Sequence, residues 1–329
     1  MNNIAVLGLG NFGTALAHNW LEAGRSVSGW TVEQEVYDSI SQRGINEKYL
    51  KDIKLDGLKV SMSIAEAVAD AELVVLALPS GVVLSVVEDL IPHLRNEQVI
   101  LDLAKGLAPD DNLISDDIRE KLEAASLTCP LCVMMGPTIA PELAHGVYTT
   151  ALITSDDPAL AADLAASLTT ATLRLTPGKD SLGSEYWGAF KNVIALACGV
   201  VDGLKQDGRG GDNLKAAVFT AGFREAVHLL PQLGADPETA LSPAGIGDLF
   251  VTATSPHGRN REMGDRIGRG QTLEQAQKEM HMVSEGVRAA HMFQKLFHGR
   301  SIACPFVDAV CALLDGSANI DEFLEKAVG

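Results

Sequence analysis

A glycine-rich segment directly after the first apolar run restricts the possible folds of this chain more than any other part of its sequence. Residues 4–7 read Ile-Ala-Val-Leu, a short apolar strand, and residues 8–13 read Gly-Leu-Gly-Asn-Phe-Gly. A helical pattern over 14–23 and a second strand over 27–30 complete a β-α-β unit. In that context the glycines predict a tight turn whose backbone N–H groups approach a dinucleotide pyrophosphate. A plain turn is the less favoured alternative.

Strands and helices alternate over residues 4–176, which is typical of a mostly parallel sheet covered on both faces. From about residue 184 the pattern changes to long helices. We therefore expect an α/β chain with a Rossmann-type, doubly wound, dinucleotide-binding domain over 1–183 and an all-helical substrate-binding domain over 184–329. The further expected elements are strands at 73–78, 99–103, 132–135, 151–154 and 173–175, and helices at 184–204, 213–230 and 284–297.

Composition supports a folded two-domain protein and limits its partners. At 329 residues the chain exceeds the usual size of a single core, and 47% of its residues are hydrophobic. The formal net charge of -17 argues against nucleic acid or an anionic membrane surface as a partner. The longest apolar stretch, residues 73–87, is interrupted by Pro79, Ser80 and Gly81 and is too short to span a bilayer. No stable membrane insertion is expected.

The cysteines and histidines predict neither a disulfide scaffold nor a metal site. The five cysteines form an odd set, and the N-terminus lacks a basic-then-apolar leader, so we expect a cytoplasmic protein. Cys129 and Cys132 have the spacing of a zinc or redox pair, but no second pair or spaced histidines complete it. Buried cysteines beside a strand are the favoured interpretation, and we predict no metal.

An acidic residue after the second strand bears on the choice of cofactor. Glu33 lies where dinucleotide-binding proteins hydrogen-bond the adenosine ribose, although Glu35 is close and a solvated glutamate is an equal alternative. No arginine occupies the loop over 31–35, so a 2′-phosphate would lack its usual partner. These residues favour NAD and leave NADP open.

Lys191 stands out because it lies within an apolar helix over residues 186–195, next to Asn192. Hydride transfer between a nicotinamide and a carbonyl requires a proton at the carbonyl oxygen, and a positioned lysine can donate and accept it. A lysine that extends from a partly exposed helix face to solvent is the structural alternative.

Several local strings together resemble the bacterial-type NAD(P)-dependent glycerol-3-phosphate dehydrogenases. The resemblance covers nearly the whole chain, and the order and spacing of the strings make chance improbable. The strings are GLGNFGTAL at 8–16, AKGL at 104–107, GPTIA at 136–140, FKNV at 190–193, GIGDL at 245–249 and RNR at 259–261.

The resemblance implies interconversion of glycerol 3-phosphate and dihydroxyacetone phosphate, with Lys191 as the general acid and base. It further implies a small phosphorylated substrate, a homodimer and a supply of glycerol 3-phosphate for phospholipid synthesis. The motif and the resemblance together assign cofactor contacts to Gly8, Gly10, Asn11, Phe12, Gly13, Glu33, Lys105, Ala140, Arg259, Val283 and Glu285. They assign substrate contacts to Lys105, Gly136, Thr138, Lys191, Asp248, Gly258, Arg259 and Asn260.

The chemistry of these residue types agrees with the implied roles, and each has a plainer alternative. Asp248 can orient Lys191 or cap a helix, and the residues after Gly136 can be an ordinary proline turn. A guanidinium at Arg259 suits phosphate, although clustered arginines are often solvated. Residues 259–269 contain four arginines and two acidic residues, so the local charge is 4 - 2 = +2.

The chain also departs from the family pattern. Val32 replaces an arginine that commonly binds the 2′-phosphate, which weakens the case for NADP, and Gly258 replaces a serine, which removes one hydroxyl contact to phosphate. Asn11 and Phe12 replace serine and tryptophan. A related β-hydroxyacid-type dehydrogenase and a dinucleotide sensor without catalysis remain the alternative functions.

Overall fold

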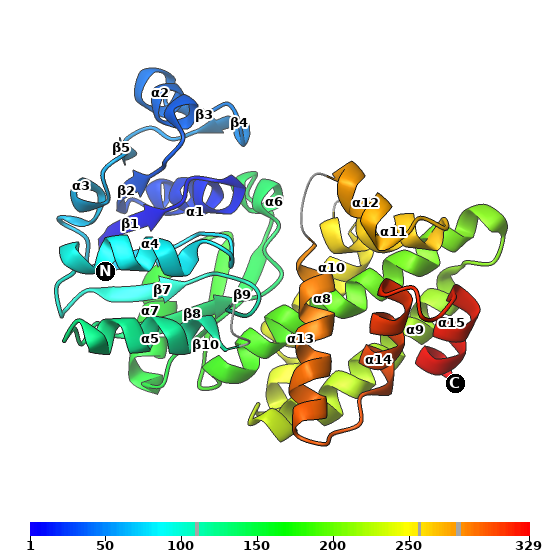
Figure 1. The fold of residues 1–329 in the computed structure, drawn as a ribbon. Helices are drawn as coiled ribbons and strands as arrows, with labels where there is room; N and C mark the ends of the chain where they lie inside the picture. Colours follow the sequence, from blue (N-terminus) through cyan, green and yellow to red (C-terminus); the bar gives the residue numbers. More distant parts are fainter. Residues whose placement is uncertain (109–111, 256–257, 281–283) are drawn as a thin grey trace. The chain divides into compact units, whose positions relative to one another are not determined.

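The chain divides into two units, Met1–Ser181 and Leu182–Gly329. The computed structural model, drawn in Figure 1, describes residues 1–108, 112–255, 258–280 and 284–329. The first unit holds a mostly parallel sheet with helices, and the described elements of the second are all helical. The predicted fold class is therefore confirmed. The border between units lies at 181/182, whereas the sequence predicted a domain border at 183/184.

The sheet of the first unit has the strand order β10-β9-β8-β7-β6-β1-β2-β5. Neighbouring strands are parallel except at β8 and β9, which are antiparallel. A separate antiparallel pair is formed by β3 and β4. The strands are β1 Asn3–Leu7, β2 Ser26–Trp30, β3 Ile45–Asn46, β4 Leu50–Lys54, β5 Lys59–Ser61, β6 Leu73–Leu76, β7 Val99–Asp102, β8 Leu131–Met135, β9 Thr149–Thr154 and β10 Leu173–Gly178.

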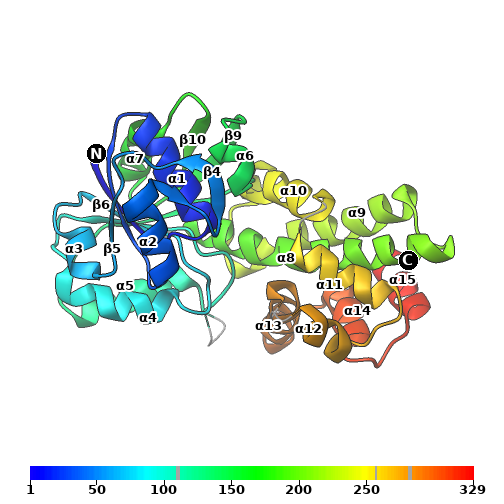
Figure 2. The ribbon, with the colours of Figure 1, turned by 90° about the horizontal axis from the view of Figure 1, so that it is seen from above.

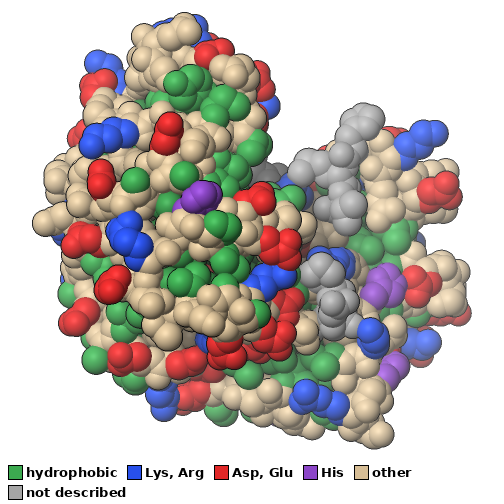
Figure 3. All heavy atoms as spheres, turned by 60° about the vertical axis from the view of Figure 1, so that its left-hand side comes forward, with side chains coloured by type: hydrophobic (Ala, Val, Ile, Leu, Met, Phe, Trp, Pro, Cys, Tyr) green, Lys and Arg blue, Asp and Glu red, His purple; other side chains and the backbone are tan. Residues whose placement is uncertain are grey.

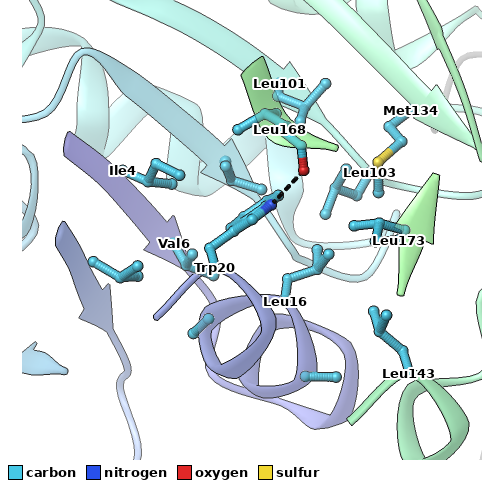
Figure 4. Packing of buried hydrophobic residues seen from close by; sticks show 14 of the residues in the cluster. Ile4, Val6, Leu16, Trp20, Leu101, Leu103, Met134, Leu143, Leu168 and Leu173 are labelled. Carbon is cyan, nitrogen blue, oxygen red and sulfur yellow. Dashed lines mark hydrogen bonds between the residues drawn. The ribbon is translucent and has the colours of Figure 1, made fainter. Parts of the chain in front are cut away.

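Helices cover both faces of this sheet, so alternate residues of its strands enter two cores. On β1, Ile4 and Val6 face one core and Ala5 and Leu7 face the other. Trp20 fills the first core, where its indole N–H donates to the carbonyl of Leu168 at 3.2 Å (Figure 4). The helices of this unit are α1 Asn11–Glu22, α2 Gln34–Arg43, α3 Ile64–Val68, α4 Val83–Leu90, η1 Ile91–His93, α5 Ile114–Ala124, α6 Ala140–Ala144 and α7 Pro158–Leu168.

The first unit differs from the sequence prediction at its edges. The helix after the glycine turn begins at Asn11 rather than at residue 14, so Gly13 lies inside it. The strands β3, β4 and β5 were not predicted, because they are short or carry several lysines and aspartates without a clean alternation. The seven predicted strands are all present, with ends shifted by one to three residues.

In the second unit, helix α8 runs along the length of the helical bundle (Figures 1 and 2). By length and composition alone, the segment Ser181–Asp207 could cross a membrane, but 94% of its apolar window is buried inside the protein. It is therefore a core helix. The helices are α8 Ser181–Gly203, η2 Leu204–Asp207, α9 Asp212–Leu229, η3 Leu230–Leu233, η4 Pro237–Leu241, η5 Pro243–Gly247, α10 Asp248–Thr254, α11 Arg259–Gly268, α12 Leu273–Met280, α13 Glu285–Gly299, α14 Pro305–Leu314 and α15 Ile320–Val328.

Glycines let α8 and α11 pack backbone against backbone. A Cβ added to Gly199 of α8 would lie 2.1 Å from the carbonyl oxygen of Arg261, and one added to Gly264 of α11 would lie 1.9 Å from that of Leu196. Both distances are far below van der Waals contact, so the two helices can approach this closely only without side chains at these positions. The close contact fixes the first half of α11 against the C-terminal half of α8.

Charge is spread over the surface. On the face drawn in Figure 3, acidic side chains (red) and basic side chains (blue) are interspersed, and the described residues of that face form no continuous basic area. The absence of a basic area on the described part of this face agrees with the strongly negative total charge of the sequence.

Candidate functional site

The glycine turn lies between β1 and α1. Gly8 has φ +102°, and a Cβ there would lie 2.5 Å from the carbonyl oxygen of Ala77. A Cβ on Gly13 would lie 2.0 Å from the carbonyl oxygen of Gly8, whereas one on Gly10, the N-cap of α1, would have no neighbour within 4 Å. The fold therefore requires glycine at 8 and 13. Packing does not explain the glycine at 10, which leaves open space beside a helix N-terminus.

Two buried polar residues hold this turn from behind. Asn46 of β3 donates from Nδ2 to the carbonyl of Leu9 and to Oγ1 of Thr14, both at 2.9 Å. Thr14 also donates to the carbonyl of Leu9 at 3.1 Å. Asn46 could not be recognised from the sequence, because a lone asparagine 32 residues after Thr14 forms no recognisable pattern.

The turn lies where the winding of the sheet reverses. From β1 the chain continues to β2 on one side, while β6, β7 and β8 lie on the other and are parallel to β1. Loops after parallel strands share one edge of a sheet, and ligands of such sheets bind at this reversal. The predicted residues Lys105, Gly136 and Thr138 follow β7 and β8 at the same edge.

Lys105 connects the loops after β7 and β8. Its ammonium donates to the carbonyl of Gly136 at 3.0 Å, and Thr138 Oγ1 lies 3.4 Å from the same oxygen. Gly136 has φ +154°, and a Cβ there would lie 2.9 Å from Cα of Ala151. Ala140 is the buried first residue of α6. The structure thus brings the predicted substrate residues Lys105, Gly136 and Thr138 into contact. It also explains why position 136 is a glycine, since a side chain there would be too close to Ala151.

Glu33 lies at the N-cap of α2, just after β2, within a cluster that the sequence did not predict. Its carboxylate accepts from Nζ of Lys48 at 2.5 Å and from the hydroxyl of Tyr49 at 2.7 Å, and Lys48 also pairs with Glu35. The hydrogen bond from Lys48, followed by that from Tyr49, lowers the pKa of Glu33. Lys48 therefore places a positive charge beside Glu33, although the loop over 31–35 contains no basic residue. The cluster of Glu33, Glu35 and Lys48 still has a net charge of 1 - 2 = -1.

In the second unit, Lys191 and Asp248 form a buried ion pair. Nζ of Lys191 on α8 lies 2.5 Å from Oδ2 of Asp248, the first residue of α10, and the two side chains are 4% and 3% exposed. The alternative of a lysine that reaches solvent is wrong. Burying two charges is costly, so a pair of this kind persists where the geometry satisfies it or where the protein uses it.

Asn260 connects three helices near this pair. Its Nδ2 donates to Oδ1 of Asn192 at 2.8 Å, and its Oδ1 accepts from Ser284 Oγ at 2.7 Å and from the backbone N–H of Gly286 at 2.8 Å. Asn192 in turn donates to the carbonyl of Gly188. Since Asn192 follows Lys191 in α8, this network fixes the lysine relative to the starts of α11 and α13.

The arginines over 259–269 do not form the basic cluster that the sequence predicted. Arg261 pairs with Asp202, Arg266 with Glu262 and Glu279, and Arg269 with Asp265. Arg259, the exposed first residue of α11, has no ion pair or hydrogen bond from its side chain within the described ranges. The local excess of positive charge is therefore carried by Arg259, next to the N-cap Gly258 and a helix N-terminus.

One further predicted cofactor contact lies at the start of α13. Glu285 is the half-buried first residue of this helix. Val283 lies outside the residues that the structure describes.

Comparisons with known proteins agree with this arrangement over the whole chain. The family model of the NAD-dependent glycerol-3-phosphate dehydrogenase N-terminus matches residues 3–161, and that of the C-terminus matches residues 180–325. The chain belongs to the NAD(P)-dependent glycerol-3-phosphate dehydrogenases. It is therefore an oxidoreductase that uses NAD or NADP.

Relatives and solved structures match this dehydrogenase chain from end to end. A glycerol-3-phosphate dehydrogenase [NAD(P)+] of Clostridium botulinum is 34% identical, covering 98% of this chain and 97% of its own. That of an Exiguobacterium species is 37% identical, covering 98% and 94%. The crystal structure of glycerol-3-phosphate dehydrogenase from Coxiella burnetii, 28% identical, covers 98% of both chains with a TM-score of 0.88.

Proposed function

We propose that the chain interconverts dihydroxyacetone phosphate and sn-glycerol 3-phosphate, with Lys191 as the general acid and base. The buried ion pair of Lys191 and Asp248 carries this proposal. A charged amine on an apolar helix, held 2.5 Å from a carboxylate and shielded from water, has little purpose in packing. Shielding strengthens its interaction with any oxygen that gains negative charge beside it.

When bound, the nicotinamide supplies the hydride for reduction and accepts it in oxidation. In reduction, the ammonium of Lys191 donates a proton to the carbonyl oxygen of dihydroxyacetone phosphate as the alcohol forms. In oxidation, the neutral amine accepts the proton from the hydroxyl of glycerol 3-phosphate. The carboxylate of Asp248 stabilises the ammonium form and orients Nζ, and the Asn192–Asn260 network holds the helix turn that carries it.

Arg259 is the residue that we assign to the substrate phosphate. Its guanidinium is exposed and lacks a partner in the described part of the chain, and it begins α11, whose N-terminal N–H groups also favour an anion. Asn260 keeps a second N–H that can donate to the same phosphate, because one N–H and the oxygen are engaged within the protein. Lys105, Gly136 and Thr138 are proposed contacts of substrate on the first unit.

The first unit fits a dinucleotide at its glycine turn. The open space at Gly10 admits a pyrophosphate against backbone N–H groups, and Asn11 and Phe12 begin the helix that faces it. Glu33 suits a ribose hydroxyl, and the net negative charge of its cluster with Glu35 and Lys48 disfavours a 2′-phosphate. We therefore propose a preference for NAD. Ala140, Val283 and Glu285 remain proposed cofactor contacts.

We further propose a cytoplasmic homodimer that supplies glycerol 3-phosphate to phospholipid synthesis. The five free, buried cysteines are compatible with a reducing compartment. The dimer and the metabolic role rest on the family alone. Size-exclusion chromatography with light scattering tests the dimer, and a monomeric mass would contradict it.

Oxidation of NADH and of NADPH with dihydroxyacetone phosphate, measured at equal concentrations, tests the reaction and the cofactor together. We expect turnover with both and a higher kcat/KM with NADH. Equal or better use of NADPH would contradict the role of Glu33. Activity with unphosphorylated keto acids alone would favour a β-hydroxyacid-type dehydrogenase, and NADH binding without turnover of any ketone would favour a sensor.

A further inference from the structure

A cluster of three different metal-ligating side chains lies where α13 and α14 meet, apart from the residues assigned to substrate and cofactor. His298 belongs to the last turn of α13, Cys304 is the N-cap of α14, and Asp308 lies in the first turn of α14. One ligand atom from each of the three lies within 4.8 Å of those of the other two. Nε2 of His298 is 3.0 Å from Oδ1 of Asp308, and the thiol of Cys304 lies beside the same side chain.

The connection between the two helices is well defined by hydrogen bonds. Ser301 adopts φ +58°, and its N–H donates to the carbonyl of His298 at 3.0 Å. The N–H of Ile302 donates to the carbonyl of Phe297 at 2.9 Å. This turn reverses the chain, and α13 packs against α14 (Figure 1). The three ligands are thus brought together by an ordered local structure.

We propose that His298, Cys304 and Asp308 bind a divalent transition metal of the zinc type, with solvent in the fourth position. Nitrogen, sulfur and oxygen ligands of these types are those that Zn²⁺ accepts in tetrahedral sites. Tetrahedral bonds of about 2.0–2.3 Å place ligand atoms roughly 3.3–3.8 Å apart. The ligand atoms of the cluster lie within 4.8 Å of one another, and those of His298 and Asp308 are 3.0 Å apart, so small side-chain movements suffice to reach this spacing. His298 and Asp308 are partly exposed, which gives the ion a route from solvent.

The electrostatics of the cluster favour a cation. The carboxylates of Asp308 and Glu225 both lie close to the Cys304 thiol. The same negative groups attract a dication, which displaces the thiol proton on binding. A thiolate and the Asp308 carboxylate then balance its two charges. Gln294 of α13 donates to Oδ1 of Asp308 at 2.8 Å and orients this carboxylate from outside the ligand set.

The sequence predicts no metal, because Cys129 and Cys132 lack a second cysteine pair or spaced histidines. The spacing found here, H-x5-C-x3-D, matches neither pattern, and it becomes a chelating set only when the turn at Ser301 folds. The site would be additional to the dehydrogenase reaction, since none of its residues is assigned to substrate or cofactor.

Titration of the chelator-treated, full-length protein with Co²⁺ tests the proposal. We expect one Co²⁺ per chain, with a near-ultraviolet thiolate-to-metal absorption band that Zn²⁺ abolishes by competition. Cys304→Ser should lose the band. Gln294→Ala should weaken binding by about 10- to 100-fold, the usual effect of losing a group that orients a ligand, and His298→Gln by at least as much.

The chain offers matched controls for both kinds of ligand. His291 of α13 forms a similar pair, 2.9 Å apart, with Asp315, the C-cap of α14. Cys311 of α14 is another buried thiol. His291→Gln and Cys311→Ser should leave the band and the stoichiometry unchanged. Absence of the band in the unmodified protein, or its persistence in Cys304→Ser, would overturn the proposal. If Cys304→Ser fails to fold, unchanged Co²⁺ affinity in the surface variant His298→Gln would do so equally.

Discussion

The two units prepare for ligands by different physical means. In the first unit, the proposed cofactor site consists of backbone at strand ends, and side chains are absent where the ligand would approach, as at Gly10. In the second unit, the site consists of buried charged and polar side chains held by one another, as in the pair of Lys191 and Asp248. The proposed cofactor site therefore depends on open space beside backbone N–H groups, and the site in the second unit depends on buried charged side chains.

The contrast predicts which substitutions each site tolerates least. Added volume should harm the first site, because a Cβ occupies ligand space or clashes with backbone. Removal of charge should harm the second, because a buried partner is then left without its counter-charge.

Lys191→Ala should lower kcat with dihydroxyacetone phosphate by about 10²- to 10⁴-fold, since the proton donor is lost. NADH affinity, measured by fluorescence titration, should change little, because the glycine turn is untouched. Asp248→Asn serves as the companion variant and should reduce kcat less, since it removes the counter-charge but keeps the amine. Near-normal turnover of Lys191→Ala would remove this residue from the mechanism.

Arg259→Ala should lower kcat/KM for dihydroxyacetone phosphate by about 100-fold, the effect of losing a charge-assisted contact to phosphate. Most of the loss should be in KM. The matched control is Arg269→Ala, which removes an exposed arginine already paired with Asp265. Equal effects of the two substitutions would show that general surface charge, and not a phosphate contact, is responsible.

Asp202→Asn should destabilise the second unit by about 2 kcal/mol at neutral pH. Asp202 accepts from Lys215 and Arg261, each at 2.7 Å. Burial opposes ionisation, but these hydrogen bonds outweigh it and lower the pKa of Asp202 from its ordinary 3.8.

The sign of the pH dependence follows from that lowered pKa. The stabilisation by Asp202 is complete above the unfolded value and is lost as the pH falls through the folded value. Urea unfolding of both proteins from about pH 6 to pH 3 should therefore give curves that differ above about pH 5 and converge below pH 3.8. A difference that is constant with pH would contradict the ion-pair explanation.

Gly10→Ala should weaken NADH binding by roughly tenfold, or about 1.4 kcal/mol, and leave the Tm unchanged. Gly13→Ala is the contrasting variant. It should lower the Tm, because its Cβ would lie 2.0 Å from the carbonyl oxygen of Gly8. Loss of Tm in both variants would mean that Gly10 is required by packing and not by a ligand.

Lys48→Ala should lower kcat/KM with NADPH by about two- to threefold and change NADH use less, because exposed charges are screened. The substitution removes the cation between Glu33 and Glu35. The double variant Glu33→Gln/Glu35→Gln reverses the local charge and should improve NADPH use. If NADPH use stays constant in both, this cluster does not contact the adenosine ribose.

The sequence predicted features that are local or chemically out of place. The glycine turn could be recognised because a strand and a helix flank it within one short segment, and Lys191 because an apolar helix surrounds it. Features formed by distant segments could not be recognised. Asn46 reaches the turn only because β3 and β4 fold back over α1, and Lys48 approaches Glu33 by the same path.

The arginines illustrate the same limit. The net charge of residues 259–269 does not include partners elsewhere in the chain, such as Asp202 on α8 and Glu279 on α12. The predicted basic cluster was therefore wrong, although Arg259 itself remains available to bind an anion. The net charge of a sequence segment is the sum over its own residues, whereas the charge near a site also depends on residues that the fold brings there from other segments.

The backbone contact between α8 and α11 has a consequence for screens of variants. Every substitution at Gly199 or Gly264 adds atoms where a carbonyl oxygen already lies, about 2 Å away. A growth-based deep mutational scan should therefore show these glycines to be as intolerant as Lys191, although they contact no ligand. Parallel measurement of protein abundance would separate the glycines from an exposed residue assigned only to the substrate, since Arg259 variants should accumulate and the glycine variants should not.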